Sequence, residues 1–427
     1  MTRALVIGSG GREHALAWKL AQSPEVDDVV AAPGNVGIAE IGECLAVRPD
    51  DPRAVADLAE RVAADLVVVG PEDPCVAGVV DAVEARGRLA FGPRAGAARL
   101  EGSKAWMKEV LAAAGVPTAR HRTFTADQVD LALEHLDTLQ DTWVIKPDGL
   151  TAGKGVVVTD SLAIARATVR DYLSGASCGP AGTTCVIEEG MVGPELSLFA
   201  LCDGTDASFV GCVQDHKRVG DGDTGPNTGG MGAYTPVPFA TDELVDEVMV
   251  KIVRPTLEEL VRRDADYRGV LFCGLMLTPE GPKVLEYNVR FGDPECQALV
   301  RRLDSDLFVH LLECATGSIR TRVRLRDDAA VALWLAADGY PAAPRTGDHI
   351  TGLERARALH DVEVFVAGAA GGDGGDRGMV TAGGRVLCVT ATGPDLRSAV
   401  DTAYRAAGEI HFDGMHYRHD IAAQGLP

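Results

Sequence analysis

The stretch Ile145-Lys146-Pro147-Asp148-Gly149-Leu150-Thr151-Ala152-Gly153-Lys154-Gly155-Val156-Val157-Val158 places two lysines around a glycine-bearing turn, between two apolar runs typical of β-strands. Glycines let backbone N–H groups approach anionic oxygens, and the ammonium groups of Lys146 and Lys154 supply the positive charge that a triphosphate attracts. A Walker A loop would open a helix, whereas a valine-rich strand follows here. The stretch predicts a hairpin-like clamp for polyphosphate; the alternative is an ordinary glycine-rich hairpin with solvated lysines.

The composition sets limits on the class of protein. With 427 residues, 46% of them hydrophobic, the chain is long enough for about three domains with real cores. Its 41 basic and 62 acidic residues give a formal charge of −21, which argues against a broad nucleic-acid or anionic-membrane surface. The ten cysteines form no Cys-x-x-Cys pair, and neither a signal peptide nor a membrane-spanning run is evident. We therefore expect a cytoplasmic protein that acts on small molecules.

The first hundred residues alternate short apolar runs with helical patterns, which predicts a parallel α/β sheet. The predicted strands are 4–7, 29–32, 66–69 and 89–91. Ligands of such sheets bind at the carboxyl ends of the strands, where Gly8–Glu13 follows the first strand and Gly70–Glu72 the third. Because a helix N-terminus attracts anions, we expect a phosphate near Gly10, Gly11 and Arg12.

A helix predicted from about Ser103 to Ala114 carries Lys104, and the first domain boundary is expected near residue 102. The following unit, 123–192, is predicted to be a small α+β domain that holds the clamp. Within it, a helix is expected at 161–174 and a strand at 185–188.

Residues 193 to about 324 are predicted to form a larger antiparallel sheet with covering helices. The C-terminal part has its own strand and helix candidates. These are strands 330–336, 362–366 and 386–390, and a helix at 395–407. The fold class is therefore α/β and α+β, with several domains.

The segment Val284–Arg290 carries a polar face on a predicted strand. A period of two puts Glu286, Asn288 and Arg290 on one face of that strand, with apolar residues opposite. Carboxylate and amide oxygens suit Mg²⁺, which takes its remaining ligands from water and nucleotide phosphates. Arg290 would then bind an oxygen of the reacting phosphate or carboxylate. The alternative is an exposed sheet face with an incidental ion pair.

The segment Gln214–Tyr234 is rich in glycine and contains both acidic and basic side chains. A glycine-rich loop of this length normally covers an active site rather than joining core elements. Asp221-Gly222-Asp223 suggests a calcium loop, but the twelfth position, where an EF-hand needs glutamate, is Gly232. We therefore expect a site cover and not a calcium site.

Three stretches together carry a family resemblance: Lys146–Val156, Gln214–Tyr234 and Glu286–Glu295. They closely resemble the phosphoribosylamine–glycine ligases, the glycinamide ribonucleotide synthetases of the ATP-grasp superfamily. Supporting stretches extend the resemblance over the whole chain: Gly8–Lys19, Gly70–Glu72, Glu101–Lys104 and Gly384–Thr390.

This resemblance implies an ATP-grasp fold preceded by a Rossmann-like parallel α/β domain and followed by a small mixed C-terminal domain. The implied division is 1–102 for the N-terminal substrate domain, 103–122 with 193–324 for the main ATP-grasp (A) domain, 123–192 for the lid (B) domain, and 325–427 for the C-terminal domain.

The resemblance also implies a reaction of purine biosynthesis. ATP, glycine and 5-phosphoribosylamine would give ADP, phosphate and glycinamide ribonucleotide, with glycyl phosphate as the intermediate. The cofactors implied are ATP and Mg²⁺ or Mn²⁺. We expect small-molecule partners only and a monomer or weak dimer.

Residue roles follow from the same resemblance. Phosphate contacts are expected from Lys104 and Lys146, with Gly153, Lys154 and Gly155 folding over the nucleotide. The rest of the nucleotide site comprises Glu188, Glu189 and Met191 around the adenine and Glu195 at the ribose. Glu286 and Asn288 are the implied metal ligands.

The two other substrates have their own implied contacts. The 5-phosphate of phosphoribosylamine would reach Gly10, Gly11 and Arg12. The remaining residues of that site are Glu13, Gly70, Pro71, Glu72 and Asp293. Asp215 and Lys217 are candidates beside glycine, and they complete the catalytic set with Arg290 and Lys154.

Three rival interpretations stay open. One is another ATP-grasp carboxylate–amine ligase of nucleotide biosynthesis, with a different acceptor. A nicotinamide-dependent oxidoreductase is suggested by Gly8-Ser9-Gly10-Gly11, but Glu13 stands where the dinucleotide fingerprint needs glycine. A catalytically dead nucleotide-binding regulator is the third, and the intact Lys146, Lys154 and Glu286 argue against it.

Overall fold

The computed structural model describes residues 1–150, 155–177, 183–372 and 378–426 of the chain. Four strands of the N-terminal region were predicted and are confirmed, within a five-stranded parallel sheet of order β3-β2-β1-β4-β5. The strands are β1 (Arg3–Gly8), β2 (Asp28–Pro33), β3 (Glu43–Cys44), β4 (Leu66–Val69) and β5 (Leu89–Phe91). Strands β1, β2, β4 and β5 are apolar and buried over most of their length, as expected where helices cover both faces of a sheet.

The helices of this region connect the strands as an α/β sheet requires. They are α1 (Gly11–Leu20), α2 (Pro52–Arg61), α3 (Glu72–Ala77), α4 (Val79–Ala85) and α5 (Ala95–Gly102). The next helix, α6 (Lys104–Ala114), begins and ends as predicted. Ser103 caps its N-terminus by accepting a hydrogen bond from the backbone N–H of Trp106, and Gly115 ends it with a φ of 67°.

The two paired strands of the predicted hairpin are confirmed. Strand β7 (Trp143–Pro147) pairs antiparallel with β8 (Val157–Thr159), with Ile145 opposite Val157. The turn residues Thr151–Lys154, which include the predicted Gly153 and Lys154, lie outside the described residues.

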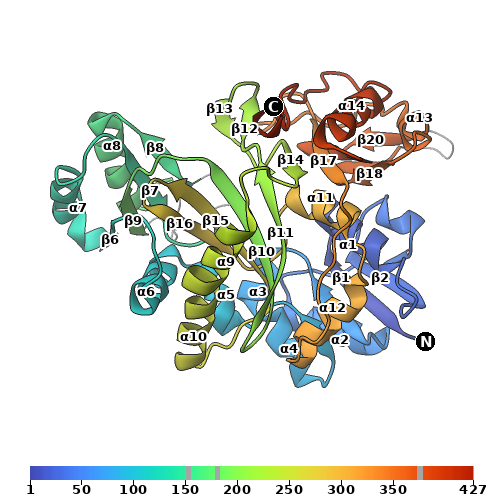
Figure 1. The fold of residues 1–427 in the computed structure, drawn as a ribbon, viewed down its shortest axis with the longest axis horizontal. Helices are drawn as coiled ribbons and strands as arrows, with labels where there is room; N and C mark the ends of the chain where they lie inside the picture. Colours follow the sequence, from blue (N-terminus) through green and yellow to red (C-terminus); the bar gives the residue numbers. More distant parts are fainter. Residues whose placement is uncertain (151–154, 178–182, 373–377, 427) are drawn as a thin grey trace.

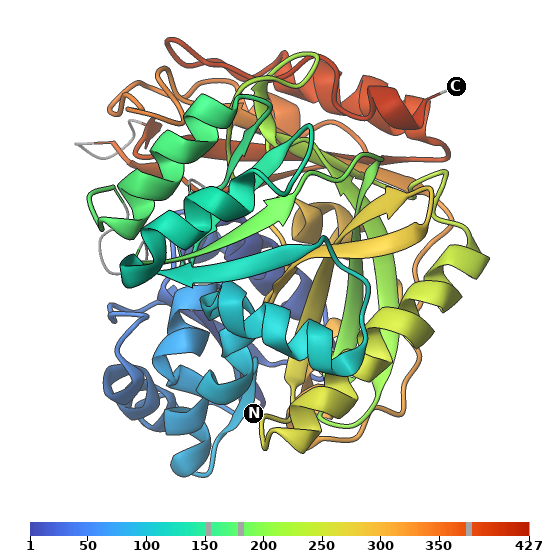
Figure 2. The same cartoon turned by 90° about the vertical axis from the view of Figure 1, so that its left-hand side faces the viewer.

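The hairpin belongs to a separate lobe. Its sheet has the order β6-β9-β7-β8, with β6 (His121–Thr125), β9 (Thr184–Glu189) and the helices α7 (Val129–Leu136) and α8 (Leu162–Leu173). The lobe buries its own apolar cluster, which includes Phe124, Ile145 and Val169. Figure 1 shows this lobe set off at the left, and Figure 2 shows it in front of the main sheet. A lobe with its own core can hold its shape while its position relative to the main sheet changes.

The main sheet has eight antiparallel strands in the order β16-β15-β10-β11-β14-β17-β21-β18. The strands are β10 (Glu195–Asp203), β11 (Ala207–Asp215), β14 (Gly232–Thr235), β15 (Arg268–Thr278), β16 (Gly281–Asn288), β17 (Ala329–Ala336), β18 (Val362–Val366) and β21 (Arg385–Gly393). Because β14 pairs with β17, the sheet runs across the position at 324/325 where a domain boundary was predicted.

Helices cover this sheet and tie it to the N-terminal region. They are α9 (Asp242–Val248), α10 (Arg254–Arg262), α11 (Glu295–Arg302), α12 (Leu307–Thr316), α13 (Leu353–Arg357) and α14 (Leu396–Ala407). Helix α11 packs against α1 of the N-terminal sheet. The start of α1 also lies beside the residues that follow β16, because Nη1 of Arg12 donates to the carbonyl of Phe291 at 3.0 Å.

The glycine-rich segment 214–234 is more regular than a loop. It contains the hairpin β12 (Arg218–Gly220) and β13 (Thr224–Asn227). The buried Arg418, about 200 residues later in the chain, holds this hairpin through a 2.7 Å ion pair between its Nη1 and Oδ1 of Asp223. The prediction of one long open loop over this segment is therefore wrong, because a hairpin occupies its middle.

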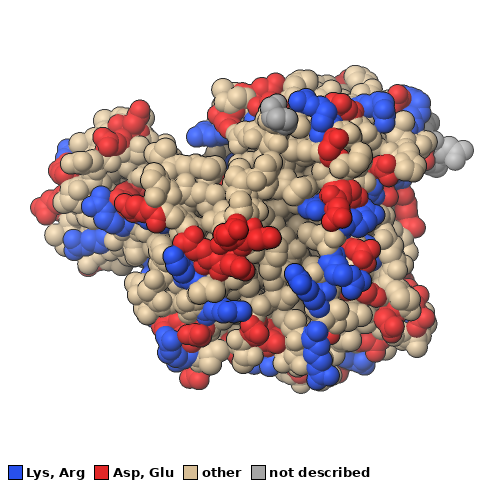
Figure 3. All heavy atoms as spheres, in the orientation of Figure 1, with Lys and Arg blue, Asp and Glu red and all other residues tan. Residues whose placement is uncertain are grey.

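Figure 3 shows acidic and basic side chains interspersed on one face, with acidic residues gathered near α9. No described helix has the length and apolar character needed to cross a membrane. The nine cysteines in the described part of the chain are all free thiols.

Candidate active site

The candidate site begins at the end of β16. Glu286 and Asn288 lie on this strand, whereas Tyr287 between them is fully buried on the opposite face. The prediction that Arg290 shares the strand is wrong in one respect, because β16 ends at Asn288 and Arg290 follows in the turn. The turn directs the guanidinium of Arg290 toward the N-terminal region, where it meets Glu72.

Four cationic side chains surround the carboxylate of Glu286. Burial alone would raise the pKa of this carboxyl, but their positive charges outweigh burial and lower the pKa. They are Lys217, Lys146, Lys104 and Arg290. The structure thus brings together side chains from four predicted segments around one carboxylate.

The lysines beside the clamp are held by backbone oxygens and by Glu188. Nζ of Lys104 donates to the carbonyl of Gly149 at 2.8 Å, and Nζ of Lys146 donates to the carbonyl of Leu285 at 3.0 Å. Nζ of Lys146 also lies 3.1 Å from Oε1 of Glu188. Lys146 therefore links strand β7 to β16.

Lys108 is a residue of this cluster that the sequence analysis missed. It is 1% exposed, and its Nζ lies 3.1 Å from Oε1 of Glu188 and 2.7 Å from Oγ1 of Thr118. Burial lowers the pKa of Lys108 to about 8, although Glu188 opposes the shift. Its position four residues after Lys104, on the same face of α6, was a usable indication.

Glu188→Gln is expected to lower the free energy of unfolding by about 3 kcal/mol, because two buried ammonium groups lose their shared carboxylate. Glu189→Gln is the matched control. Glu189 pairs with Arg120, which is 73% exposed, so the expected loss is below about 1 kcal/mol. Urea unfolding followed by circular dichroism measures both changes, and equal losses would contradict the burial argument.

The nucleotide candidates Glu189, Met191 and Glu195 line the connection from the lobe to the main sheet. Glu189 accepts a hydrogen bond from the backbone N–H of Arg120 at 2.9 Å. Met191 lies between β9 and β10, and Glu195 begins β10. Oε2 of Glu195 lies 2.6 Å from Nζ of Lys217, so this carboxylate is already paired.

Arg290 joins β16 to the N-terminal region through two carboxylates. Its Nε lies 3.0 Å from Oε2 of Glu72, and its Nη2 lies 2.9 Å from Oε1 of Glu101. Burial opposes ionisation of Glu72, but Arg290 and Arg12 lower its pKa to about 2. Burial raises the pKa of Glu101 to about 7 in spite of Arg290. Glu101 is a second residue that the sequence analysis missed.

The loop after β1 wraps around Glu13. Oε2 of Glu13 accepts the backbone N–H of Gly10 at 2.7 Å, and Oε1 lies 2.6 Å from Nε of Arg12. A Cβ at Gly70 would come within 2.2 Å of this carboxylate, so only glycine fits there. Pro71 follows as the residue before α3. The guanidinium of Arg12 is buried, and it also donates to the carbonyl of Phe291 at 3.0 Å.

Asp293 links this loop to the C-terminal strands. Its Oδ2 lies 3.2 Å from Nη2 of Arg385, and a Cβ at Gly10 would stand 3.6 Å from the same oxygen. The neighbouring Gly11 packs on Trp334, because a Cβ there would be 2.6 Å from the indole ring. The predicted substrate residues Gly10, Gly11 and Asp293 therefore adjoin one another.

Asp215 and Lys217 lie at the end of β11 and just beyond it. Burial and the negative charge of Glu295 raise the pKa of Asp215 well above its ordinary range. Burial also raises the pKa of Glu295, which accepts a 3.3 Å hydrogen bond from Oγ of Ser197. Among the described residues, Oδ1 of Asp215 has no hydrogen-bond partner. Glu295 is the third residue that was missed.

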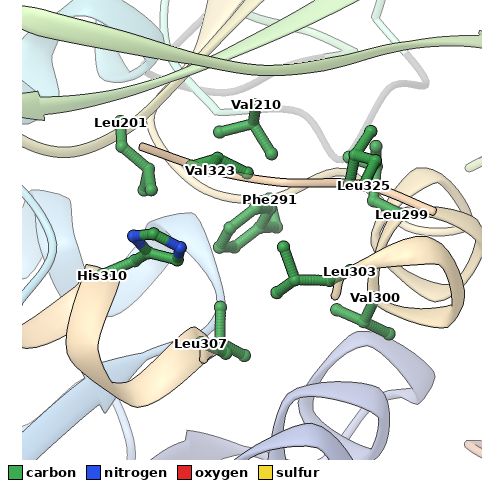
Figure 4. Close-up of a pocket in the computed structure, with 10 residues that line it drawn as sticks. All are labelled: Leu201, Val210, Phe291, Leu299, Val300, Leu303, Leu307, His310, Val323 and Leu325. Atoms are coloured by element: carbon green, nitrogen blue, oxygen red, sulfur yellow. The ribbon is translucent and has the colours of Figure 1, made fainter. Parts of the chain in front are cut away.

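Figure 4 shows a small apolar pocket that does not belong to this site. Apolar side chains such as Leu201, Phe291 and Leu303 line it, with His310 at one side. Its volume of about 10 Å³ leaves no room for more than a water molecule. An open hollow of about 440 Å³ adjoins the candidate site, between Pro71 and Leu150.

The oxygen donors available to a metal are few. In the ranges that the structure describes, no group of three or more His, Cys, Asp or Glu side chains could hold a metal ion. Glu286 and Asn288 offer two oxygen donors beside each other on one strand, a set that suits a hard cation sharing its ligands with phosphate.

Three family models match consecutive parts of the chain. They are the N domain (2–101), the ATP-grasp (A) domain (102–296) and the C domain (330–424) of phosphoribosylglycinamide synthetase. The chain belongs to the phosphoribosylglycinamide synthetase family. The family predicted from the sequence is therefore confirmed.

Relatives support this membership over the full length. Proteins named phosphoribosylamine–glycine ligase from Caulobacter vibrioides and Streptomyces coelicolor are each 49% identical to the chain, over 99% of it and 98% and 99% of their own lengths. The crystal structure of phosphoribosylamine–glycine ligase from Thermotoga maritima has a TM-score of 0.84 and 35% identity, and the match covers 99% of this chain and 100% of that one.

More distant structures bear on the fold alone. The biotin carboxylase domain of the Hydrogenobacter thermophilus 2-oxoglutarate carboxylase has a TM-score of 0.73 at 17% identity, over 97% of this chain and 91% of that one. The predicted multidomain α/β architecture of the synthetase is confirmed by this likeness together with the family models.

Proposed function

We propose that the chain joins glycine to 5-phosphoribosylamine at the expense of ATP, giving glycinamide ribonucleotide, ADP and phosphate in purine biosynthesis. The observation that carries this proposal is the gathering of four cationic side chains around Glu286, in a chain that matches the synthetase family over all three of its domains. Positive charge fixed around one strand end suits a reaction in which phosphate carries the developing negative charge.

The chemistry requires two steps. A glycine carboxylate oxygen attacks the terminal phosphorus of ATP, ADP leaves, and glycyl phosphate forms. The amine nitrogen of phosphoribosylamine then attacks the carbonyl carbon, loses a proton, and phosphate leaves. Phosphorylation is needed because a free carboxylate would have to expel oxide. The amine is itself the nucleophile, so juxtaposition with the acyl phosphate is the main task of the protein.

The nucleotide would bind between the lobe and β16. Phosphate contacts fall to Lys104, Lys146 and Lys154, with Gly153 and Gly155 at the covering turn. Adenine would lie near Glu188, Glu189 and Met191, and ribose near Glu195. Glu195 would then exchange or share its present ion pair with Lys217.

Glu286 and Asn288 would hold a divalent cation, Mg²⁺ or Mn²⁺. When bound, this ion would neutralise and orient the phosphates. Arg290 would contact the transferred phosphoryl group, and Asp215 and Lys217 would lie beside glycine. In these roles, the charged side chains must hold fixed positions, and the site must keep water away from the glycyl phosphate.

Phosphoribosylamine would bind on the N-terminal side. Its 5-phosphate suits the start of α1 at Gly10, Gly11 and Arg12, where the helix N-terminus favours an anion. The other proposed contacts of this substrate are Glu13, Gly70, Pro71, Glu72 and Asp293. Arg290, which contacts Glu72, would stand between this site and the nucleotide.

The domain division, the location and the oligomeric state are also part of the proposal. We propose domains at 1–102, 103–122 with 193–324, 123–192 and 325–427, although the pairing of β14 with β17 joins the second and fourth in one sheet. A cytoplasmic location and a monomer or weak dimer fit a biosynthetic enzyme with small-molecule substrates.

The omission of single substrates tests the function. ADP release is expected to need glycine and phosphoribosylamine together, and mass spectrometry should detect glycinamide ribonucleotide. Another ATP-grasp carboxylate–amine ligase would instead turn over with different substrates. If another carboxylic acid sustained faster turnover than glycine, the substrate assignment would be wrong while the ATP-dependent chemistry would stand.

A further inference from the structure

Glu101 lies at the end of α5 with a side chain that is only 10% exposed, and both of its oxygens are engaged. Oε2 accepts the backbone N–H of Val289 at 2.7 Å. Oε1 accepts Nη2 of Arg290 at 2.9 Å. One carboxylate from the N-terminal region thus fixes both the backbone before Arg290 and the guanidinium itself.

Glu72 also contacts Arg290, but its situation differs. It is 22% exposed at the start of α3, where the phosphoribosylamine sugar is proposed to bind. Glu101 has no free oxygen with which to bind a substrate. Glu72 can therefore change partners when substrate arrives, whereas Glu101 is suited to hold the guanidinium throughout.

The two carboxylates determine which donors of Arg290 stay available. Glu72 takes Nε and Glu101 takes Nη2, and two contacts on different nitrogens of a planar group prevent its rotation. Within the described residues, Nη1 makes only a 3.5 Å bond to the carbonyl of Phe291. A donor on Nη1 is therefore left for an incoming phosphate oxygen.

The chain around Glu101 gives it a rigid base. Helix α5 ends at Gly102, and Ser103 caps α6 while its hydroxyl donates to the carboxylate of Asp148 at 3.1 Å. Lys104 follows and donates to Gly149. Residues 101–104 therefore include both Glu101, which contacts Arg290, and Lys104, a predicted phosphate contact.

We propose that Glu101 is the positioning residue of Arg290, holding its guanidinium in the orientation that meets the transferred phosphoryl group. This inference rests on the proposed function, in which Arg290 contacts that group. Glu101 acts through Arg290 and does not itself touch substrate.

Glu101→Gln tests the inference. The amide can still accept from Val289, but its NH₂ faces Nη2 of Arg290, so two donors meet and the charge is lost. Assayed at pH 8, above the pKa of about 7 that burial gives Glu101, kcat is expected to fall on the order of 100-fold, with KM for ATP and glycine changed less than about 3-fold. Glu101→Asp keeps the charge but cannot span both donors, so an intermediate loss is expected.

A double-mutant cycle separates positioning from a general structural effect. If Glu101 acts through Arg290, Glu101→Gln should lower kcat by less than about 3-fold in an Arg290→Ala background. Glu84→Gln is the matched control, since Glu84 pairs with Arg94 in the same region at 2.5 Å and lies outside the site. This control should keep wild-type kcat.

Two results would overturn the inference while the proposed function stands. One is a Glu101→Gln enzyme with kcat within about 3-fold of wild type, and the other is an equal loss with and without Arg290. Thermal unfolding of each variant shows whether a loss of kcat reflects misfolding. If Glu101→Gln misfolds, the kcat of Glu101→Asp tests the inference instead. A wild-type protein that formed no glycinamide ribonucleotide would instead overturn the proposed function, and this inference with it.

Discussion

Glu286→Ala is expected to lower kcat at least about 1000-fold while the protein remains folded. The substitution removes one of the two proposed metal ligands and the carboxylate that balances the surrounding cations, Lys104, Lys146 and Lys217. Lys146 and Lys217 keep their ion pairs with Glu188 and Glu195, so the protein is expected to stay folded. ADP release at increasing Mg²⁺ concentrations measures the effect.

Glu280→Ala is the matched control for this experiment. Glu280 lies in the turn between β15 and β16, is 77% exposed, and pairs only with Lys283 among the described residues. Its replacement should leave kcat near that of wild type. Near-normal turnover of Glu286→Ala at saturating Mg²⁺ would show that Glu286 holds no essential metal.

Arg290→Ala is expected to lower kcat about 1000-fold, with a much smaller change in KM for ATP, because a fixed positive charge acts mainly on the transition state. Arg290→Lys should recover little. An ammonium group cannot contact Glu72, Glu101 and a phosphate oxygen with the geometry of a planar guanidinium. Single-turnover measurement of ADP formation isolates the chemical step.

Arg94→Ala controls for the loss of an N-terminal ion pair, because Arg94 pairs with Glu84 away from the site. It should keep the wild-type single-turnover rate. A rise in KM for ATP with unchanged kcat in Arg290→Ala would assign Arg290 to ground-state binding and contradict the proposed role.

The fold was predictable where local pattern and burial agree. The strand Leu66–Val69 is buried at all four positions, so the apolar run in the sequence begins and ends with the strand. Gly115 ends α6 through its positive φ. Strand β3 has only two residues, too few to show a pattern. The pairing of β14 with β17 joins segments about 100 residues apart, and no local pattern specifies such a partner.

The hairpin at 218–227 escaped prediction for a related reason. Its glycines indicate a loop, but Arg418 and Asp420 from the end of the chain hold it in place. Such long-range polar contacts depend on the complete fold. The sequence therefore identified the segment but not its conformation.

The candidate site was predictable where residues follow recognisable stretches, such as Lys146 and Glu286. Lys108 was missed, and Glu101 and Glu295 were given no role although they lie in stretches that carry the family resemblance, because the importance of all three depends on burial and on their partners. A lysine on a helix or a glutamate before a glycine is ordinary in sequence. Only the structure shows that Glu101 contacts Arg290 and that Lys108 contacts Glu188.

A crystal structure with a non-hydrolysable ATP analogue, Mg²⁺ and glycine would show whether Arg290, Glu286 and Asn288 meet the nucleotide and its metal. We expect the terminal phosphate within hydrogen-bonding distance of the Arg290 guanidinium, with Mg²⁺ bound to Glu286 and Asn288 and the lobe closed over the nucleotide. A nucleotide bound elsewhere, or a metal that contacts neither Glu286 nor Asn288, would contradict it.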